Sequence, residues 1–279
     1  AVRRFENGHY VPEPLDYSRA DVKGRYQAFT KQSERALDWQ RDSVNDILRK
    51  IRSADSNPGL LDTILGDEYL LYGAHRDGSL IGPPGKILAR RHGAICIAAT
   101  DGAVWITHLK RKGKKEDGYF KLPATQVLGD KIKDVPFEPI ELLYTSKVET
   151  FKEIWYRQEN QVAYLYFEFY NGAMSTEQCE RLTAAYKELN LRPNIKVVVL
   201  MGGRDFWSNG IHLNVIEHAS SPADESWANI NAIDDLVQAI MQTKDKLVIS
   251  AMHGSAGAGG VMMALAADKV FARENIILN

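Results

Sequence analysis

The chain has 279 residues, a formal net charge of -1 and a hydrophobic fraction of 44%. That length can bury more than one core, so two domains are the default expectation. The nearly balanced charge excludes a surface devoted as a whole to nucleic acid or membrane, and any basic patch must be local. No apolar stretch approaches the roughly 18 residues of a membrane-spanning helix. The chain has two cysteines, Cys96 and Cys179, and both lie in apolar stretches. We therefore expect a soluble protein of the reducing cytoplasm.

The first 37 residues are polar and carry Pro12 and Pro14 without sustained periodicity, which predicts an extended arm or linker. From Leu37 the pattern changes to one helix, and Asn57, Pro58 and Gly59 end it. The apolar positions of this helix, at helical spacing, are Val44, Ile47, Leu48 and Ile51.

Residues 60–110 are typical of β-structure. Short apolar runs occupy residues 69–72, 86–88, 94–99 and 103–109. Between them lie Asp77-Gly78, Pro83-Pro84-Gly85, His92-Gly93 and Asp101-Gly102. Asp-Gly between apolar runs favours tight hairpins, because glycine readily adopts a positive φ. The sequence therefore predicts a helix followed by a small β-barrel or sandwich over residues 38–130.

A charged segment with prolines, residues 131–155, is expected to link this domain to a second one. In the second domain, apolar runs at residues 162–169, 196–201, 247–251 and 269–272 predict strands. Helices are expected between them, the first capped by Ser175 and Gln178, and the second with its inner face at Trp227, Ile230, Ile233, Val237 and Ile240. Alternating strands and helices predict an α/β domain with parallel strands. The chain ends inside this pattern, so we expect a fragment of a longer protein.

Two glycine-bearing turns follow strands of the second domain. They are MGGRDFWSNGIHL, residues 201–213, and MHGSAGAGGVMM, residues 252–263. A strand that breaks on glycine into a helix exposes unpaired backbone N–H groups, and two such turns side by side can hold an oxyanion. A purely structural use of glycine in tight turns remains open. A dinucleotide fingerprint is disfavoured, because Met262 stands where the third glycine belongs.

The pattern FWSNGIHL followed by HGSAGAGGVMMALAAD resembles the enoyl-CoA hydratase (crotonase) superfamily over residues 156–279. The resemblance implies a crotonase-type ββα spiral, C-terminally truncated, that binds a coenzyme A thioester. It implies that the N–H groups of Ile211 and Gly259 bind the thioester oxygen. Along the coenzyme A groove it places Ser208, Asn209, Gly210, Gly257 and Gly260.

The departures from the crotonase pattern bear on the chemistry. Met262 aligns with the catalytic glutamate of a hydratase, and a thioether cannot transfer a proton. The second acidic position of the family falls beyond Asn279. His212 and His253 replace the usual aspartate and asparagine. Either histidine can serve as a proton donor or be a hydrogen-bonded loop residue, and both interpretations stay open.

The first domain has its own resemblance. The marks Asp38-Trp39, ILRKIR at residues 47–52, Asn57-Pro58-Gly59 and Pro84-Gly85 resemble the C-terminal domain of methionyl-tRNA formyltransferase, an OB-like barrel. In that family, formyltetrahydrofolate binds a separate upstream domain. A formyltransferase barrel followed by a crotonase domain resembles the HypX/HoxX family of hydrogenase maturation proteins. This implies formyl transfer to coenzyme A, carbon monoxide release from formyl-CoA, and the maturation machinery or the hydrogenase large subunit as partner.

Two alternatives remain. One is a diverged acyl-CoA hydratase or isomerase. The other is an RNA-binding module, because the barrel carries a basic run at Lys110, Arg111, Lys112, Lys114 and Lys115. The run lacks interleaved aromatic residues, and a solvated hairpin loop is the simpler interpretation. No metal site is expected, because C-x-x-C and H-E-x-x-H motifs are absent and the histidines are scattered.

Overall fold

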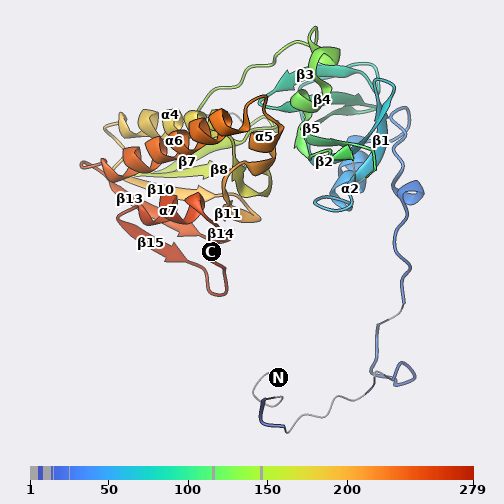
Figure 1. Cartoon of the computed structure of the whole chain (residues 1–279), viewed down its shortest axis with the longest axis horizontal. Helices are drawn as coiled ribbons and strands as arrows, with labels where there is room; N and C mark the ends of the chain where they lie inside the picture. Colours follow the sequence, from blue (N-terminus) through green and yellow to red (C-terminus); the bar gives the residue numbers. More distant parts are fainter. Residues whose placement is uncertain (1–5, 9–13, 15, 25, 115–116, 145–146) are drawn as a thin grey trace. The chain divides into compact units, whose positions relative to one another are not determined.

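The computed structural model describes residues 6–8, 14, 16–24, 26–114, 117–144 and 147–279 (Figure 1). The chain divides into two units, Ala1–Glu34 and Arg35–Asn279. In the first unit the described residues form local turns; for example, Asp16 accepts hydrogen bonds from the N–H and the Oγ of Ser18. The second unit contains the two folded parts described next.

The first folded part is a six-stranded antiparallel sheet curled around a core (Figure 1). Its strands are β1 (Leu60–Ile64), β2 (Asp67–Asp77), β3 (Ile87–Arg91), β4 (Ala94–Ala99), β5 (Gly102–Arg111) and β6 (Leu122–Pro123). They are ordered β1-β2-β5-β4-β3, and β6 pairs with β5. Helix α2 (Val44–Arg52) buries its predicted apolar stripe in this core, and α3 (Ala124–Leu128) and η3 (Gly129–Ile132) follow the sheet. This is the small barrel with a leading helix that the sequence predicted.

The predicted hairpin at Asp77-Gly78 is wrong. Strand β2 ends there, but its partners are β1 and β5, and Asp77 lies opposite Ala103. The Asp77 carboxylate accepts hydrogen bonds from the N–H groups of Ser79 and Leu80, at 2.8 and 2.7 Å, and this turns the chain away from the sheet. The turn is therefore closed by the aspartate side chain instead of by strand pairing.

The second folded part is an α/β structure. Its strands are β7 (Ile154–Glu159), β8 (Val162–Phe167), β9 (Ala173–Met174), β10 (Val197–Gly202), β11 (Phe206–Ser208), β12 (Gly210–Ile211), β13 (Leu247–Met252), β14 (Ser255–Ala256) and β15 (Lys269–Ala272). Its helices are α4 (Thr176–Asn190), α5 (Leu213–His218), α6 (Pro222–Met241) and α7 (Gly259–Leu265), with the short η4 (Tyr170–Gly172) before β9. The main sheet has the order β15-β13-β10-β8-β7, and all its pairs are parallel except β7 with β8.

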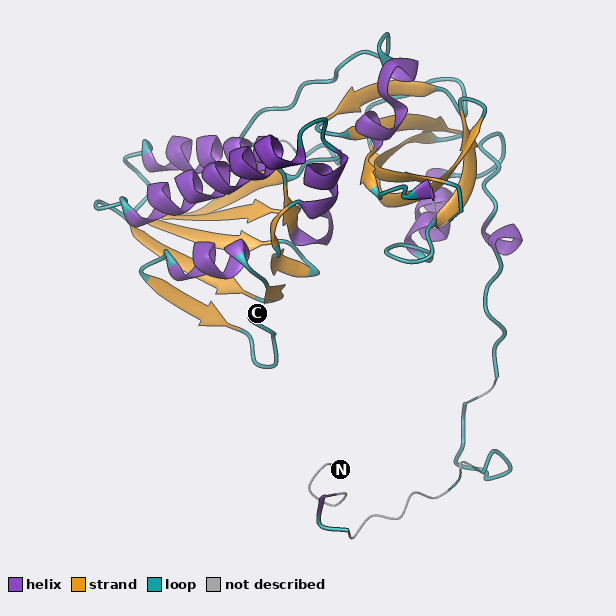
Figure 2. Ribbon diagram, viewed as in Figure 1, coloured by secondary structure: helices purple, strands orange, loops and turns teal. Residues whose placement is uncertain are grey.

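Helices α4 and α6 lie side by side on one face of the main sheet (Figure 2). The predicted inner face of α6 is partly wrong, since Trp227 and Ile230 are 70% and 40% exposed. The buried stripe instead consists of Asn229, Ala232, Ile233, Leu236 and Ile240. A polar residue, Asn229, occupies this stripe because it is hydrogen-bonded inside the core, and it hid the periodicity in the sequence.

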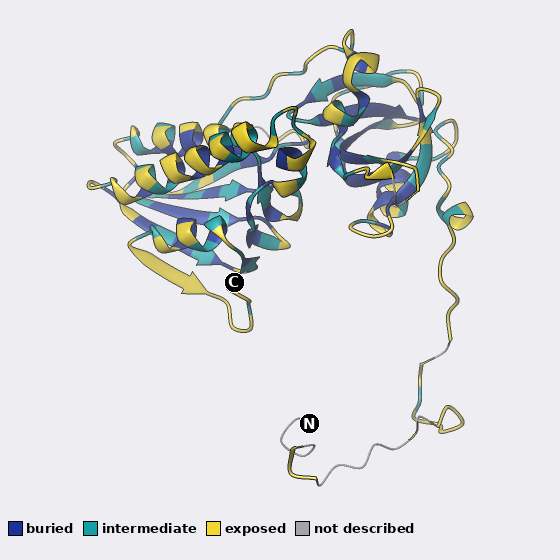
Figure 3. Cartoon of the chain, in the orientation of Figure 1, coloured by how far each residue is buried: buried dark blue, intermediate teal, exposed yellow. Residues whose placement is uncertain are grey.

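The edge strand β15 is exposed at each of its positions (Figure 3). Within the described part of the chain, every helix is too short or too polar to cross a membrane.

Candidate active site

The two glycine turns lie against each other. The first contains β11 and β12, and the second contains β14 and leads into α7. Strand β11 pairs with β14 in parallel, and the N–H of Gly257 donates to the carbonyl oxygen of Ser208 at 2.9 Å. A Cβ built on Gly210 would lie only 2.8 Å from the backbone nitrogen of Gly259. The backbones of the two turns are therefore in direct contact.

Two glycines are required for this contact. Gly210 has a φ of +75°, a conformation that other residues rarely adopt. At Gly260, a Cβ would lie 2.3 Å from the carbonyl oxygen of Ser208. A side chain at either position would force the two turns apart, so the glycines hold a close approach of two backbones.

Gly259 is the first residue of α7, and its N–H consequently has no acceptor within the helix. Ile211, half-buried, is the second residue of β12, which pairs with β9. Several neighbouring N–H groups are engaged elsewhere. Asn209 N–H donates to Gly172 O at 2.7 Å, Gly210 N–H to Ser208 Oγ at 3.1 Å, and His212 N–H to Asn229 Oδ1 at 3.1 Å.

The side chains of the first turn hold its shape. Ser208 is 1% exposed, and its Oγ donates to the sulfur of Met174 at 3.2 Å. The Asn209 side-chain amide donates to the carbonyl oxygen of Asn171 at 2.7 Å. The Ser208 side chain is therefore enclosed within the turn.

His212 is buried and caps the N-terminus of α5. Its Nδ1 accepts a hydrogen bond from the N–H of Val215 at 3.3 Å, which leaves Nε2 as the protonated nitrogen of the neutral ring. Burial lowers the pKa of His212. The neutral ring is therefore the stable form at neutral pH, and His212 can donate only its Nε2 proton. Its ring lies parallel to that of His108, with centroids 6.2 Å apart.

His253 and Met262 are exposed. Met262 is on α7, one turn after Gly259, with 63% of its surface accessible. The thioether that the crotonase resemblance aligns with the hydratase glutamate therefore lies on the helix that Gly259 begins.

Neither cysteine is poised as a nucleophile. Burial raises the pKa of Cys179 to about 12, and burial also raises the pKa of Cys96. Both are buried thiols, far from the reactive thiolate form. Among the described residues, no three His, Cys, Asp or Glu side chains gather as metal ligands would.

A cavity of about 520 Å³ lies between the barrel and the α/β part. Its polar lining includes Arg52, Asp55, His75, Tyr170 and Arg204. It reaches the first glycine turn at Gly203 and Phe206, but neither Ile211 nor Gly259 lines it.

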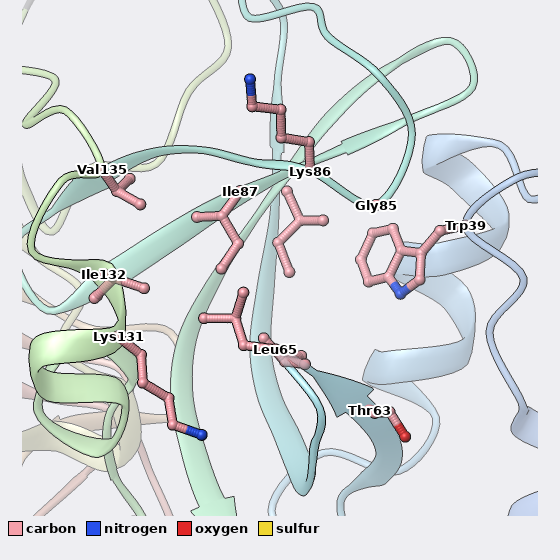
Figure 4. Close-up of a pocket in the computed structure, with 11 residues that line it drawn as sticks. Trp39, Thr63, Leu65, Gly85, Lys86, Ile87, Lys131, Ile132 and Val135 are labelled. Atoms are coloured by element: carbon pink, nitrogen blue, oxygen red, sulfur yellow. The ribbon is translucent and has the colours of Figure 1, made fainter.

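A smaller cavity of about 260 Å³ lies in the barrel (Figure 4). Trp39, Leu65 and Ile87 supply apolar walls, and Lys86 and Lys131 also line it. The Trp39 Nε1–H donates to Asp62 at 2.8 Å, so the indole is fixed in place. Among the described residues that line this cavity, none is a carboxylate, a histidine or a cysteine.

The basic run lies at the end of β5 and beyond it. Lys112 pairs with Glu68 at 2.9 Å, and the Arg111 guanidinium lies over the rings of Tyr69 and Tyr119. Lys115 is outside the described residues. The run is therefore partly neutralised, and it does have aromatic neighbours, which come from other segments and were not visible as interleaving in the sequence.

Sequence reasoning missed Asn229 and Tyr170. Asn229 is fully buried, and its amide links His212 N–H to the carbonyl oxygen of Met174. Tyr170 contacts the barrel from the α/β part. The sequence signal for Asn229 is a polar residue inside an apolar helix. Tyr170 has none, because Asp55, which accepts its hydrogen bond, is 115 residues away in sequence.

Comparison with known proteins agrees with both resemblances. Residues 157–278 match the enoyl-CoA hydratase/isomerase family, and residues 30–118 match the formyl transferase C-terminal domain. Over 83 residues the chain is 35% identical to a methionyl-tRNA formyltransferase from Paraburkholderia phymatum, covering 29% of this chain and 25% of that protein.

Two relatives match the chain from end to end. The hydrogenase maturation factor HoxX of Bradyrhizobium diazoefficiens is 46% identical over 279 residues, which is 100% of this chain and 47% of HoxX. The crystal structure of HypX from Aquifex aeolicus in complex with tetrahydrofolic acid superposes with a TM-score of 0.91 at 45% identity, covering 100% of this chain and 48% of HypX. The chain thus spans about half the length of these relatives, and the predicted fold class, a formyltransferase-type barrel followed by a crotonase-type domain, is confirmed. The chain is a homologue of the HoxX/HypX hydrogenase maturation factors and combines these two domains.

Proposed function

We propose that this chain supplies the thioester site of an enzyme that releases carbon monoxide from formyl-CoA during maturation of a nickel–iron hydrogenase. The observation that carries the proposal is the contact between Gly210 and the Gly259 amide at the junction of the two turns. Backbone N–H groups fixed at such a junction stabilise negative charge that develops on a thioester oxygen. We assign this role to Ile211 and Gly259.

In the proposed reaction the C–S bond of formyl-CoA breaks and the formyl proton passes to the coenzyme A sulfur, which yields carbon monoxide and free coenzyme A. No water is added, so the methionine at position 262 is compatible with the chemistry. The neutral His212 holds its remaining proton on Nε2, and the exposed His253 lies before Gly254 in the second turn. We keep both as candidate proton carriers.

The formyl group would come from formyltetrahydrofolate bound in the separate formyltransferase domain that the family implies. Coenzyme A would lie along Asn209, Gly210, Gly257 and Gly260. The reaction would take place in the cytoplasm. The partner would be the maturation machinery or the hydrogenase large subunit, which uses the carbon monoxide.

The test is Gly259→Val in the complete protein. The added side chain would meet Ile233, whose Cδ1 is 2.9 Å from a Cβ built there, and would displace the amide from the oxyanion position. We expect formyl-CoA turnover, followed as carbon monoxide bound to reduced haemoglobin, to fall by at least about 100-fold. Leu265→Ala, an exposed change on the same helix, is the control and should keep the original rate. Equal rates in both variants would contradict the assignment.

A diverged hydratase is the competing enzyme, and the same preparation distinguishes the two. With crotonyl-CoA as substrate, we expect no loss of absorbance from the enoyl double bond, because Met262 cannot activate water. Hydration by the unsubstituted protein would favour the hydratase over the formyl-CoA reaction.

A further inference from the structure

We propose that Tyr170 is a positioning residue through which the barrel holds the first glycine turn in its oxyanion geometry. This inference rests on the proposed function for its catalytic consequence. The barrel would then be part of the thioester site and not only an appended domain.

Tyr170 is anchored in the barrel by three kinds of contact. Its hydroxyl donates to Asp55 at 2.6 Å, and Lys121 donates to the same hydroxyl at 3.3 Å. Its ring stacks on His108 of β5, with centroids 4.4 Å apart and planes 27° apart. A Cβ built on Gly73 would lie 3.2 Å from the tyrosine ring, so β2 also approaches it closely. A phenol ring held by stacking and by a carboxylate has little freedom to rotate.

The anchoring carboxylate is itself fixed. Asp55 follows α2, and its second oxygen accepts the N–H of Gly73 at 3.1 Å. The Asp55 carboxylate therefore joins α2, β2 and Tyr170. Burial and the hydrogen bond to Asp55 raise the pKa of Tyr170, so the hydroxyl keeps the proton that this hydrogen bond needs.

The residues directly after Tyr170 bind the glycine turn. Asn171 O accepts the side-chain amide of Asn209, and Gly172 O accepts the Asn209 N–H, both at 2.7 Å. The next two residues form β9, which pairs with Gly210 and Ile211. Asn171 has a φ of +54°, so this segment follows one tightly defined path. A continuous series of contacts thus runs from Asp55 to Ile211.

A second connection runs in parallel. Asn214, two residues after His212, donates from its side chain to the carbonyl oxygen of Lys121 at 3.0 Å. The first glycine turn consequently contacts the barrel on both sides of Ile211, through Tyr170 on one side and through α5 on the other. Removing Tyr170 leaves the second tie and the domain cores in place, which predicts a displaced turn in a folded protein.

The experiment compares Tyr170→Ala and Tyr170→Phe with Tyr166→Phe in the complete protein. Tyr166 lies on β8 and stacks on Trp155, so it is a matched tyrosine without contact to the barrel's Asp55. In Tyr170→Ala, we expect amide hydrogen exchange of residues 209–212 to quicken about tenfold or more, while that of α4 is unchanged. The rate constant kcat for carbon monoxide release should fall by about 10- to 100-fold with KM nearly unchanged, because a displaced donor affects the transition state more than binding.

Tyr170→Phe keeps the stacking and loses the hydrogen bond, so its effect should be intermediate, and Tyr166→Phe should match the unsubstituted protein. Wild-type exchange of residues 209–212 in Tyr170→Ala would overturn the proposal. If Tyr170→Ala fails to fold, exchange in Tyr170→Phe and Asp55→Asn decides in the same way. If the unsubstituted protein releases no carbon monoxide, the proposed function fails, whereas the exchange measurement still tests the role of Tyr170.

Discussion

Asn229 orders the candidate site from inside the core. It is fully buried on α6, accepts the N–H of His212 at 3.1 Å and donates to the carbonyl oxygen of Met174 at 3.0 Å. These two bonds connect α6 with the residues that follow β12 and with the end of β9. An apolar side chain in its place would leave a buried donor and a buried acceptor unpaired.

We expect Asn229→Ala to lower the free energy of unfolding by about 2 to 4 kcal/mol, from two unsatisfied backbone groups and a small cavity. Urea denaturation followed by circular dichroism measures it. The control is Asn231→Ala on the exposed side of the same helix, which should change stability by less than about 0.5 kcal/mol. Equal losses in the two variants would mean that the buried amide contributes nothing specific.

Among the secondary-structure elements, the hairpin of β1 and β2 is the clearest case that the sequence concealed. Ile64 lies opposite Asp67, so Leu65 and Gly66 form a two-residue loop, and their φ values are +50° and +87°. Such a loop favours Asn-Gly or Asp-Gly, and leucine at its first position gives no turn signal. The strand β1 was therefore absent from the prediction.

Leu65 is 52% exposed, and its left-handed backbone costs about 1 kcal/mol relative to a residue that tolerates it. We expect Leu65→Asn to stabilise the protein by about 0.5 to 1 kcal/mol, visible as a rise in the midpoint of thermal unfolding. Leu191→Asn provides the comparison, because Leu191 is also exposed but has a right-handed φ of -73°. A midpoint that falls or stays constant in Leu65→Asn would contradict this account of the turn.

At the scale of the whole molecule, burial lowers the pKa of four histidines. The pKa values of His75 and His92 fall to about 4, and those of His108 and His212 are also lowered. His75 and His108 lie in the barrel strands, and His108 faces His212 of the α/β part. Low pH is therefore expected to destabilise both folded parts and the junction between them.

The direction in which stability changes with pH follows from proton uptake by the folded and unfolded chains. Above the ordinary pKa of 6.5, these histidines are neutral in both the folded and the unfolded chain, so they do not reduce the free energy of unfolding. As the pH falls from 6.5 toward 4, the unfolded chain binds protons that the folded chain does not, so stability decreases. For His75 the loss is roughly 3 kcal/mol at most. Urea titrations between pH 7 and 4 should show a smaller decrease in the free energy of unfolding for His75→Gln than for the unsubstituted chain. The same pH dependence in both proteins would refute the effect.

The sequence predicted a large part of this fold because the relevant signals are local. The stripe of Val44, Ile47, Leu48 and Ile51 gave α2, and Ser175 with Gln178 gave the start of α4, where both capping-box bonds are present. The His92-Gly93 turn joins β3 to β4 as expected, since both residues have positive φ and Arg91 lies opposite Ala94. Apolar spacing and turn chemistry act within a few residues, so one sequence suffices to recognise them.

The sequence by itself determined the two domain types, the two glycine turns and the thioether at position 262. Only the tertiary structure placed Gly210 against Gly259, turned Trp227 and Ile230 outward, buried the Ser208 side chain, and connected Tyr170 to Asp55. Each of these depends on residues far apart in sequence, whose meeting is set by how the strands pair and how the helices pack on them. The physical reason is that a backbone turn carries its own conformational signal, whereas a contact between two turns exists only once the sheet that carries both is assembled.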